Sequence, residues 1–288
     1  MEPIISVNQI CKSYGRHKVL DNVSLHVPKG SIYGLIGKNG AGKTTLMRII
    51  TGLQEPTSGK VEYGRIRIGA LINTPACYSN LSAYQNLKAQ FITLGLTSFD
   101  RIPELLKLVG LSDTGRKSSK RFSFGMRQRL GIAIAMAGDP DVLLLDEPIN
   151  GLDPQGIVEM REVFLRINQE KGTTIIISSH LLDELSKIAT DYAFIDKGKI
   201  IKEITSQDIL LGSSHSYTAT FSDADPMLKA LDDEGIRYTV LGGGKIRIEN
   251  EITLSKLQKI AERCGTELLE FTENDTSLEG YYINLVEG

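Results

Sequence analysis

The chain of 288 residues contains only three cysteines, Cys11, Cys77 and Cys264, and none of them forms a CxxC pair. Cysteine pairs at short spacing would indicate a zinc site, and a cysteine-dense chain would indicate a disulfide scaffold. Neither pattern is present. A few scattered thiols are typical of a protein in a reducing cytosol, so we expect a cytoplasmic location.

Long apolar runs are also absent. The longest purely apolar stretches, such as Val142–Leu145 and Ile175–Ile177, are far shorter than the ~20 residues that a helix needs to cross a bilayer. No apolar segment near the first residue resembles a signal peptide. We therefore expect that this chain does not span a membrane by itself.

No surplus of basic charge is present either, since 33 lysines and arginines face 35 acidic residues and the net charge is −2. Without a global basic field, the composition does not favour nucleic acid as a partner. The local cluster "GRKSSKR" at Gly115–Arg121 is more typical of a solvated loop. Hydrophobic and charged contents of 41% and 24% are ordinary for a soluble globular protein.

What the first two hundred residues do contain is an alternation of strand and helix patterns. The short apolar runs "SIYGLIG", "DVLLLDEP" and "TTIIISSH" predict buried strands, whereas "KTTLMRIITGL" and "QGIVEMREVFLRINQEKG" have helical spacing. Continuously apolar strands are typical of parallel sheets that are covered on both faces. We predict a mainly parallel α/β domain over residues 1–212, with a mostly helical insertion at about 82–138.

Residues 213–288 show a different order, which is strand, helix, strand, strand, helix, strand. This order predicts a small ferredoxin-like α+β domain, with Gly242–Gly244 at the turn of its central hairpin. The sequence does not distinguish a regulatory role for this domain from a purely structural one.

A phosphate-binding pattern lies between the first predicted strand and its helix. In "GLIGKNGAGKTTL", Gly37 is followed at the required spacing by Gly42, Lys43 and Thr44. Glycines allow consecutive backbone amides to point at one phosphate, and the helix that follows presents its positive end. Lys43 would face the β- and γ-phosphates, and the Thr44 hydroxyl could bind Mg²⁺. The predicted nucleotide-binding residues here are Gly37, Asn39, Gly40, Ala41, Gly42, Lys43, Thr44 and Thr45.

Two further predicted strands end in ionisable residues. "VLLLDEP" ends in Asp146 and Glu147, and two neighbouring carboxylates at the end of a buried strand indicate a cation or a catalytic need. We predict that Asp146 holds Mg²⁺ through the water shell of the metal and that Glu147 accepts the proton of an attacking water. "TTIIISSH" ends in His180, which would reach the γ-phosphate at the same edge of the sheet.

The stretch "SFGMRQRLGIAIA" begins with Ser123, an ordinary residue to cap a helix, but Gly125 two positions later has no such explanation. A capped helix with a solvated first turn is one interpretation. The other is a helix end whose backbone approaches something anionic, and this stretch alone does not decide between them.

Together, "GKNGAGKTT", "FSFGMRQR", "LLLDEP", "NGLDP" and "SSH" resemble, in order and approximate spacing, the motifs of an ATP-binding cassette subunit over residues 1 to about 210. The resemblance implies a P-loop NTPase core, ATP and Mg²⁺ as ligands, and a head-to-tail dimer with a second ATP-binding subunit. It implies that Ser123 and Gly125 contact the γ-phosphate held by that second subunit. Phe124 stands where the more familiar motif has another glycine.

Three further positions resemble cassette residues. Tyr14 is similar to the aromatic residue that stacks on adenine, and Asp153 is similar to the residue that links the two sites across the dimer. Asn73 aligns with a glutamine that senses Mg²⁺ and meets the membrane partner. The surrounding "IGALINTPACYSNLSAYQNL" resembles the bacitracin and lantibiotic resistance exporters, which often have glutamate at that place, so Asn73 could reach the metal through a water.

The resemblance implies an ATP-hydrolysing subunit of an exporter of peptide antibiotics. Its membrane permease would be a separate chain that holds this subunit at the inner face of the membrane. The alternative is a soluble cassette ATPase that acts on ribosomes or DNA, although such proteins usually join two cassettes or insert a long coiled coil. A small-molecule kinase would use the phosphate loop but would leave Ser123, Asp153 and His180 unexplained.

Overall fold

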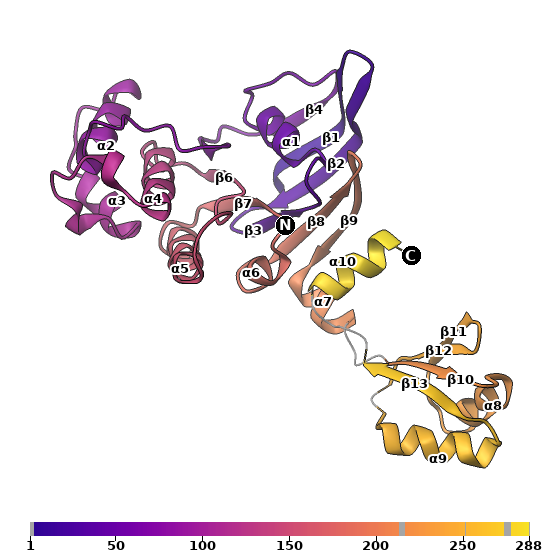
Figure 1. Cartoon of the computed structure of the whole chain (residues 1–288). Coiled ribbons are helices and arrows are strands. Elements are labelled where there is room, and N and C mark those ends of the chain that lie inside the picture. The colour runs from indigo at the N-terminus through magenta and orange to yellow at the C-terminus, as the bar shows by residue number, and fades with distance from the viewer. Residues whose placement is uncertain (1–2, 213–216, 251, 274–277, 288) are drawn as a thin grey trace. The chain divides into compact units, whose positions relative to one another are not determined.

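A computed structural model of the chain describes residues 3–212, 217–250, 252–273 and 278–287 (Figure 1). The chain divides into two compact units, Met1–Thr205 and Ser206–Gly288. The helix α7 (Ser206–Gly212), which the sequence analysis assigned to the first domain, therefore lies in the second unit.

A six-stranded sheet forms the centre of the first unit, in the order β5 (Ile68–Leu71), β6 (Val142–Asp146), β7 (Thr174–Ser179), β3 (Ile32–Ile36), β8 (Asp191–Asp196) and β9 (Lys199–Thr205). All neighbouring strands are parallel except β8 and β9, which are antiparallel. Every residue of β3, β6 and β7 is buried, as expected for continuously apolar strands that are covered on both faces. The prediction of a mainly parallel α/β core is confirmed.

A second sheet in this unit was not predicted. It is antiparallel and has the order β2 (His17–Pro28), β1 (Pro3–Tyr14) and β4 (Ser58–Tyr63). Its inward side chains, such as Val7 and Val23, share one hydrophobic core with Leu46 and Met47 of α1 (Lys43–Ile50) and with Leu144 of β6. The helix that follows the phosphate loop is thus packed into the core of the unit.

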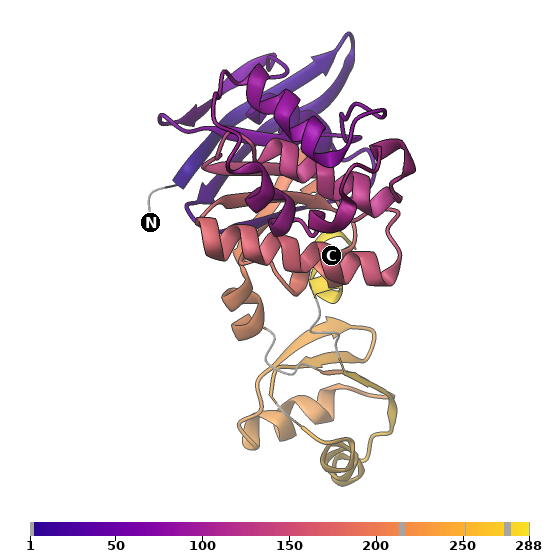
Figure 2. The same ribbon diagram turned by 90° about the vertical axis from the view of Figure 1, so that its left-hand side faces the viewer.

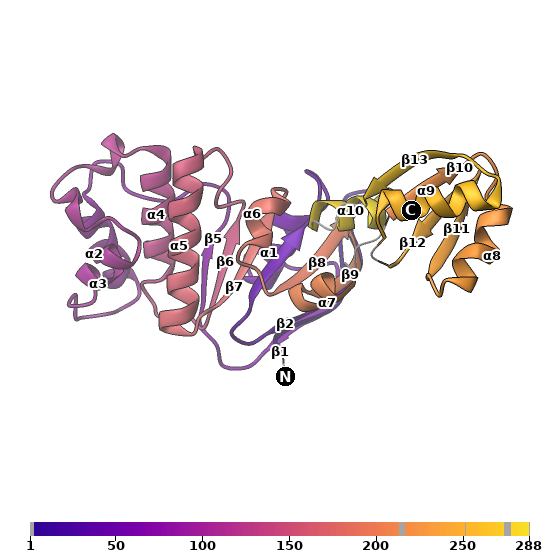
Figure 3. The same cartoon turned by 90° about the horizontal axis from the view of Figure 1, so that it is seen from below.

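The segment around residues 82–138 is helical. It contains α2 (Ala83–Thr93), α3 (Ile102–Leu108), α4 (Phe124–Ala135) and two 3₁₀ turns, η1 (Ser112–Thr114) and η2 (Ser119–Arg121). This segment faces the viewer in Figure 2. Helix α4 packs beside α5 (Pro154–Lys171), as Figure 3 shows, and the short α6 (Leu182–Ser186) follows β7.

The second unit contains β10 (Tyr217–Phe221), α8 (Asp225–Asp233), β11 (Tyr238–Gly242), β12 (Lys245–Ile248), α9 (Leu254–Cys264), β13 (Leu268–Glu273) and α10 (Leu278–Glu287). Its strands form an antiparallel sheet in the order β11, β12, β10, β13. Gly242, Gly243 and Gly244 all have positive φ angles, of 86°, 59° and 76°, at the turn between β11 and β12. Such a run of left-handed backbone requires glycine.

None of the helices in the described ranges is both long and apolar enough to cross a membrane. The parallel strands of the first unit all end at one edge of the sheet. The phosphate loop follows β3, Asn73 follows β5, Glu147 follows β6 and His180 follows β7. This edge is where the predicted chemistry gathers.

Candidate active site

The phosphate loop forms a small concave site between β3 and α1. Gly40 and Gly42 have φ angles of 83° and 108°, which a side chain would strain. A Cβ atom on Gly37 would lie 2.3 Å from the carbonyl oxygen of Ile195, so this glycine is also required by close packing. The cavity measures about 240 Å³ and is lined by Val19, Lys38, Asn39, Gly40, Ala41, Gly42, Lys43, Thr44, Thr45 and Glu147. Backbone amides at a helix N-terminus in such a cavity suit a phosphate group.

Lys43 is folded over this loop. Its side chain is only 6% exposed, and Nζ donates a hydrogen bond to the carbonyl oxygen of Gly37 over 2.6 Å. The same Nζ lies 3.1 Å from Oε1 of Glu147. The buried lysine of this cavity is therefore paired with the carboxylate predicted to act as the base.

Asp146 is held by two hydroxyl groups. Thr44 donates to Oδ2 over 2.8 Å, and Ser178 donates to Oδ1 over 2.6 Å. The sequence analysis missed Ser178, although the parallel register places this residue directly beside Asp146. Both carboxylate oxygens thus have a donor, and Asp146 is fixed with one oxygen facing the hydroxyl of the phosphate loop.

Glu147 has an unusual backbone. Its φ of 48° is in the left-handed region, which costs a non-glycine residue about 1 kcal/mol or more. Ser178 holds this conformation, since its carbonyl oxygen and its Oγ both accept from the Glu147 amide, at 3.2 and 3.0 Å. The carboxylate Oε2 lies 2.9 Å from Nδ1 of His180. No described residue makes an aligned hydrogen bond to the buried Oε1, although Lys43 Nζ is close.

The oxygen atoms at this edge fit a magnesium ion. Mg²⁺ prefers oxygen ligands and is usually held by one or two carboxylates together with substrate phosphates and water. Thr44 Oγ1 and Asp146 Oδ2 provide a hydroxyl and a carboxylate oxygen that lie 2.8 Å apart at the mouth of the phosphate loop. Among the described residues no group of three or more His, Cys, Asp or Glu side chains could hold a metal alone. A magnesium ion here would depend on the phosphates of the nucleotide.

Asn73 lies at the same edge of the sheet but takes no part in the hydrogen bonds of Asp146 and Glu147. It comes two residues after β5, whose last residue Leu71 pairs with Leu145, directly before Asp146. Asn73 is exposed and has a φ of 65°. Asparagine tolerates this left-handed backbone better than most residues, because its short polar side chain can form local hydrogen bonds.

A second cavity contains Ser123, Gly125 and Asp153. Ser123 and Asp153 are the N-cap residues of α4 and α5. Ser123 Oγ accepts from the Met126 amide over 3.2 Å, and Asp153 Oδ1 accepts from the Gly156 amide over 2.9 Å. The two helix N-termini border a cavity of about 450 Å³. Its described lining residues include none that line the phosphate-loop cavity, so one chain presents the two motif groups in separate places.

Tyr14 does not join either cavity. It ends β1 and is 48% exposed, and its hydroxyl accepts a hydrogen bond from Nε2 of Gln54. The ammonium group of Lys12 lies 5.4 Å from the centre of the ring. Its ring is therefore accessible, but it is not among the residues that line the phosphate-loop cavity.

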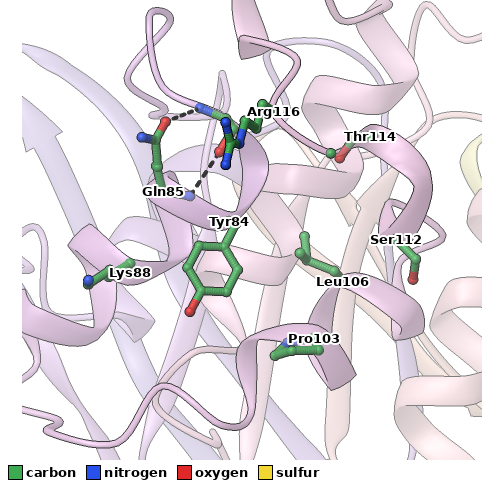
Figure 4. Close-up of a pocket in the computed structure, with 10 residues that line it drawn as sticks. Tyr84, Gln85, Lys88, Pro103, Leu106, Ser112, Thr114 and Arg116 are labelled. Carbon is green, nitrogen blue, oxygen red and sulfur yellow. Dashed lines mark hydrogen bonds between the residues drawn. The ribbon is translucent and has the colours of Figure 1, made fainter.

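The largest of these cavities, of about 790 Å³, lies in the helical segment and was not predicted (Figure 4). Tyr84, Pro103 and Leu106 supply its apolar surface, and Lys88 and Arg116 supply positive charge. Figure 4 also shows the paired hydrogen bonds between Ser82 and Gln85 that cap α2. None of its described lining residues belongs to a predicted catalytic motif, so this cavity is separate from the candidate active site.

Comparisons with known proteins find similarities over much of the chain. A family model described as "ABC transporter" matches residues 20–150. The bacitracin transport ATP-binding protein BcrA of Bacillus licheniformis is 36% identical over 302 residues, covering 100% of this chain and 99% of that protein. The lantibiotic transport ATP-binding protein SrtF of Streptococcus pyogenes is 46% identical over 208 residues, covering 69% of this chain and 90% of that protein.

Solved structures are similar to this chain as well. The protein cbiO1 from Clostridium perfringens, described as part of the ABC transporter complex cbiONQ, superposes with a TM-score of 0.65 at 26% identity, covering 73% of this chain and 92% of that chain. An ATP-binding cassette solved as a dimer bound to ADP and Pi superposes with a TM-score of 0.64 at 24% identity, covering 70% of this chain and 98% of that chain. The second of these similarities supports the fold alone.

Proposed function

Because this chain belongs to the ABC transporter family as one of its ATP-binding subunits, we propose that it powers the export of, or resistance to, a peptide antibiotic. As a member of the family it binds ATP and hydrolyses it to ADP and phosphate. The proposal of a bacitracin- or lantibiotic-type substrate is supported by two relatives that are named for transport of such compounds. The transport itself would take place through a separate membrane subunit.

The observation that carries the enzymatic part is the cluster of Lys43, Glu147 and His180 at the mouth of the phosphate loop. We propose that ATP binds with its phosphates against the loop amides and Lys43. Glu147 would then accept the proton of the water that attacks the γ-phosphate. His180, 2.9 Å from Oε2, would hold the carboxylate in place and approach the γ-phosphate from the neighbouring strand end.

Thr44 and Asp146 are the residues that would hold Mg²⁺, with Asn73 contributing through a water. When bound, the ion would neutralise the charge that develops on the β- and γ-phosphates. Ser178 contributes by fixing Asp146 and the backbone of Glu147 at the same time. Tyr14 remains our candidate for stacking on adenine, supported by its accessible ring.

We propose that two chains act as a head-to-tail dimer. Ser123, Gly125 and Asp153 lie in a cavity of their own, where this chain provides no phosphate loop to meet them. Helix N-termini attract anions, so the γ-phosphate held by a second subunit is a suitable ligand for this cavity. Each ATP would then be enclosed by the phosphate loop of one chain and the α4 N-terminus of the other.

The membrane permease would hold the chain at the inner face of the cell membrane. Action on ribosomes or DNA is not favoured, since the net charge of −2 provides no basic field. For the second unit we propose a ferredoxin-like domain, supported by its order of strands and helices and by its antiparallel sheet.

Co-purification tests the transport proposal. The chain should be recovered from solubilised membranes together with a hydrophobic subunit, and vesicles that contain both should move a peptide antibiotic when ATP is supplied. Recovery with ribosomes, and no association with membranes that contain the hydrophobic subunit, would contradict the proposal.

A further inference from the structure

Two buried amide side chains in the helical segment, Asn86 and Gln128, differ in whether their oxygen atoms accept a hydrogen bond. Asn86 is 2% exposed, its Oδ1 accepts from the amide of Tyr78 over 2.7 Å, and its Nδ2 donates to the carbonyl oxygen of Ser82 over 2.9 Å. Gln128 is 3% exposed, yet no described residue donates a hydrogen bond to its buried Oε1. A buried acceptor without a donor destabilises the arrangement that contains it.

Gln128 lies on the face of α4 that packs against β5 and the segment after it. At the far end of α4, a Cβ atom on Gly69 of β5 would lie 2.3 Å from the carbonyl oxygen of Ala135. One turn nearer the start, a Cβ atom on Gly131 would lie 2.9 Å from Cβ of Pro75. The helix thus runs antiparallel to β5 and its continuation. Gln128 precedes Ala135 by seven residues and shares its face, so Gln128 lies further along towards residues 73–77.

The segment that joins β5 to α2 is held by hydrogen bonds at only one end. The Tyr78 amide donates to Asn86 Oδ1, and the carbonyl oxygens of Tyr78 and Leu81 accept hydrogen bonds from Asn86 and Ser119. Residues 73–77, in contrast, make none of the hydrogen bonds that are found among the described residues. Backbone amides in this part are therefore available as donors, on the side of α4 where Gln128 lies.

We propose that Gln128 is a positioning residue that latches residues 73–77 onto α4 when nucleotide is bound. In that state a backbone amide of the segment donates to Gln128 Oε1, and Asn73 is held towards the phosphate loop. The latch rests on the proposed function, since it assumes that ATP binds at the edge where Asn73 lies. It couples α4, the helix that Ser123 caps, to the nucleotide of the same chain.

Cys77 reports on the latch in the unmodified protein. The rate at which a thiol reagent labels Cys77 is measured by mass spectrometry with and without a non-hydrolysable ATP analogue, and Cys264 in the second unit serves as the internal control. We expect the analogue to slow labelling of Cys77 several-fold and to leave Cys264 unchanged. If the analogue binds and Cys77 labelling does not change, the latch is wrong and the proposed function stands. If the analogue does not bind, both the latch and the proposed function are wrong.

Gln128→Met separates positioning from a structural role, because methionine matches the size of glutamine but has no polar atom to satisfy. We expect the variant to melt at a higher temperature without nucleotide, by about 2–4 °C, because the unpaired acceptor is gone. Its kcat should fall about three- to tenfold with an almost unchanged KM for ATP, since one hydrogen bond is lost only in the latched state. Gln90→Met on α2 is the matched control and should change neither quantity. A lower melting temperature with an unchanged kcat would overturn the proposal.

Discussion

The phosphate-loop cavity and the cavity at the N-termini of α4 and α5 differ in the groups that they contain. At the first, the Lys43 ammonium group and the His180 imidazole both lie within hydrogen-bond or ion-pair distance of the Glu147 carboxylate, and Thr44 donates a hydrogen bond to Asp146. The second is formed by two capped helix ends, and its two N-cap oxygens already accept from their own helices. The first places a candidate base beside the phosphate loop, whereas the second offers helix ends that can bind a phosphate.

This difference indicates that two copies of the chain would contribute different groups to each ATP. The phosphate-loop cavity holds a candidate base, Glu147, beside the loop. The α4 cavity offers positive helix ends, and the Glu159 carboxylate that lines it is paired with Arg129 at 3.1 Å. Each cavity provides what the other lacks, so the comparison predicts different consequences for substitutions in the two places.

Glu147→Gln should have the largest effect. The amide keeps the size of the side chain but cannot accept a proton, and a positioned base contributes about 10²–10⁴-fold to the rate. We expect turnover to fall by that amount while ATP binding is retained, because the loop and Lys43 are intact. The measurement is steady-state ATP hydrolysis beside direct nucleotide binding. Normal hydrolysis by this variant would remove Glu147 as the base and leave His180 as the candidate.

Ser123→Ala probes the other cavity, with Thr253→Ala as its matched control. Both residues cap a helix, with acceptor distances of 3.2 and 3.3 Å, so each substitution should cost about 1 kcal/mol of stability. Only Ser123→Ala should also reduce hydrolysis, by about tenfold or more, because hydrogen bonds to charged groups are the stronger ones.

ATP affinity of the isolated chain should be unchanged in both variants, since neither residue lines the phosphate-loop cavity. Equal rates of hydrolysis in Ser123→Ala and Thr253→Ala would show that the α4 cavity has no part in the reaction.

Asn73→Gly should have the smallest effect on hydrolysis. Glycine is the informative substitution, because alanine at a φ of 65° would add backbone strain to the loss of the side chain. We expect ATP affinity to stay nearly unchanged and transport per ATP to fall about two- to fivefold, as for loss of one water-mediated contact. Vesicles with the membrane subunit provide the measurement. Unaltered transport per ATP would show that Asn73 does not couple hydrolysis to transport, and that other residues of the segment 73–77 do so.

Much of the first unit could be predicted from its sequence, for a physical reason. Parallel strands buried on both faces are continuously apolar, so β3, β6 and β7 are visible as runs, and their ends mark the functional edge. The antiparallel sheet of β1, β2 and β4 was missed because its strands are covered on one face only. Its burial alternates along β1, and no apolar run indicates it.

The site residues could be predicted where their role follows from the local sequence. They could not be predicted where their role depends on the pairing of neighbouring strands. The phosphate loop and the strand-end carboxylates follow from spacing alone. Ser178 was missed because its role follows from its pairing with Asp146 across two strands. Gln128 was missed because it stands between Arg127 and Arg129, in a stretch that looks solvated, and only packing shows that it is buried. The roles assigned to the site residues remain predictions.

The division between the two cavities is tested most directly by dilution of the purified chain. ATP hydrolysis per chain is measured over a wide range of protein concentration with saturating Mg²⁺ and ATP, and light scattering gives the oligomeric state at each point. If each ATP is enclosed by two chains, the rate per chain should rise with concentration in the dilute range and level off as dimers form. A rate per chain that is independent of dilution, from a protein that scatters as a monomer throughout, would contradict the account.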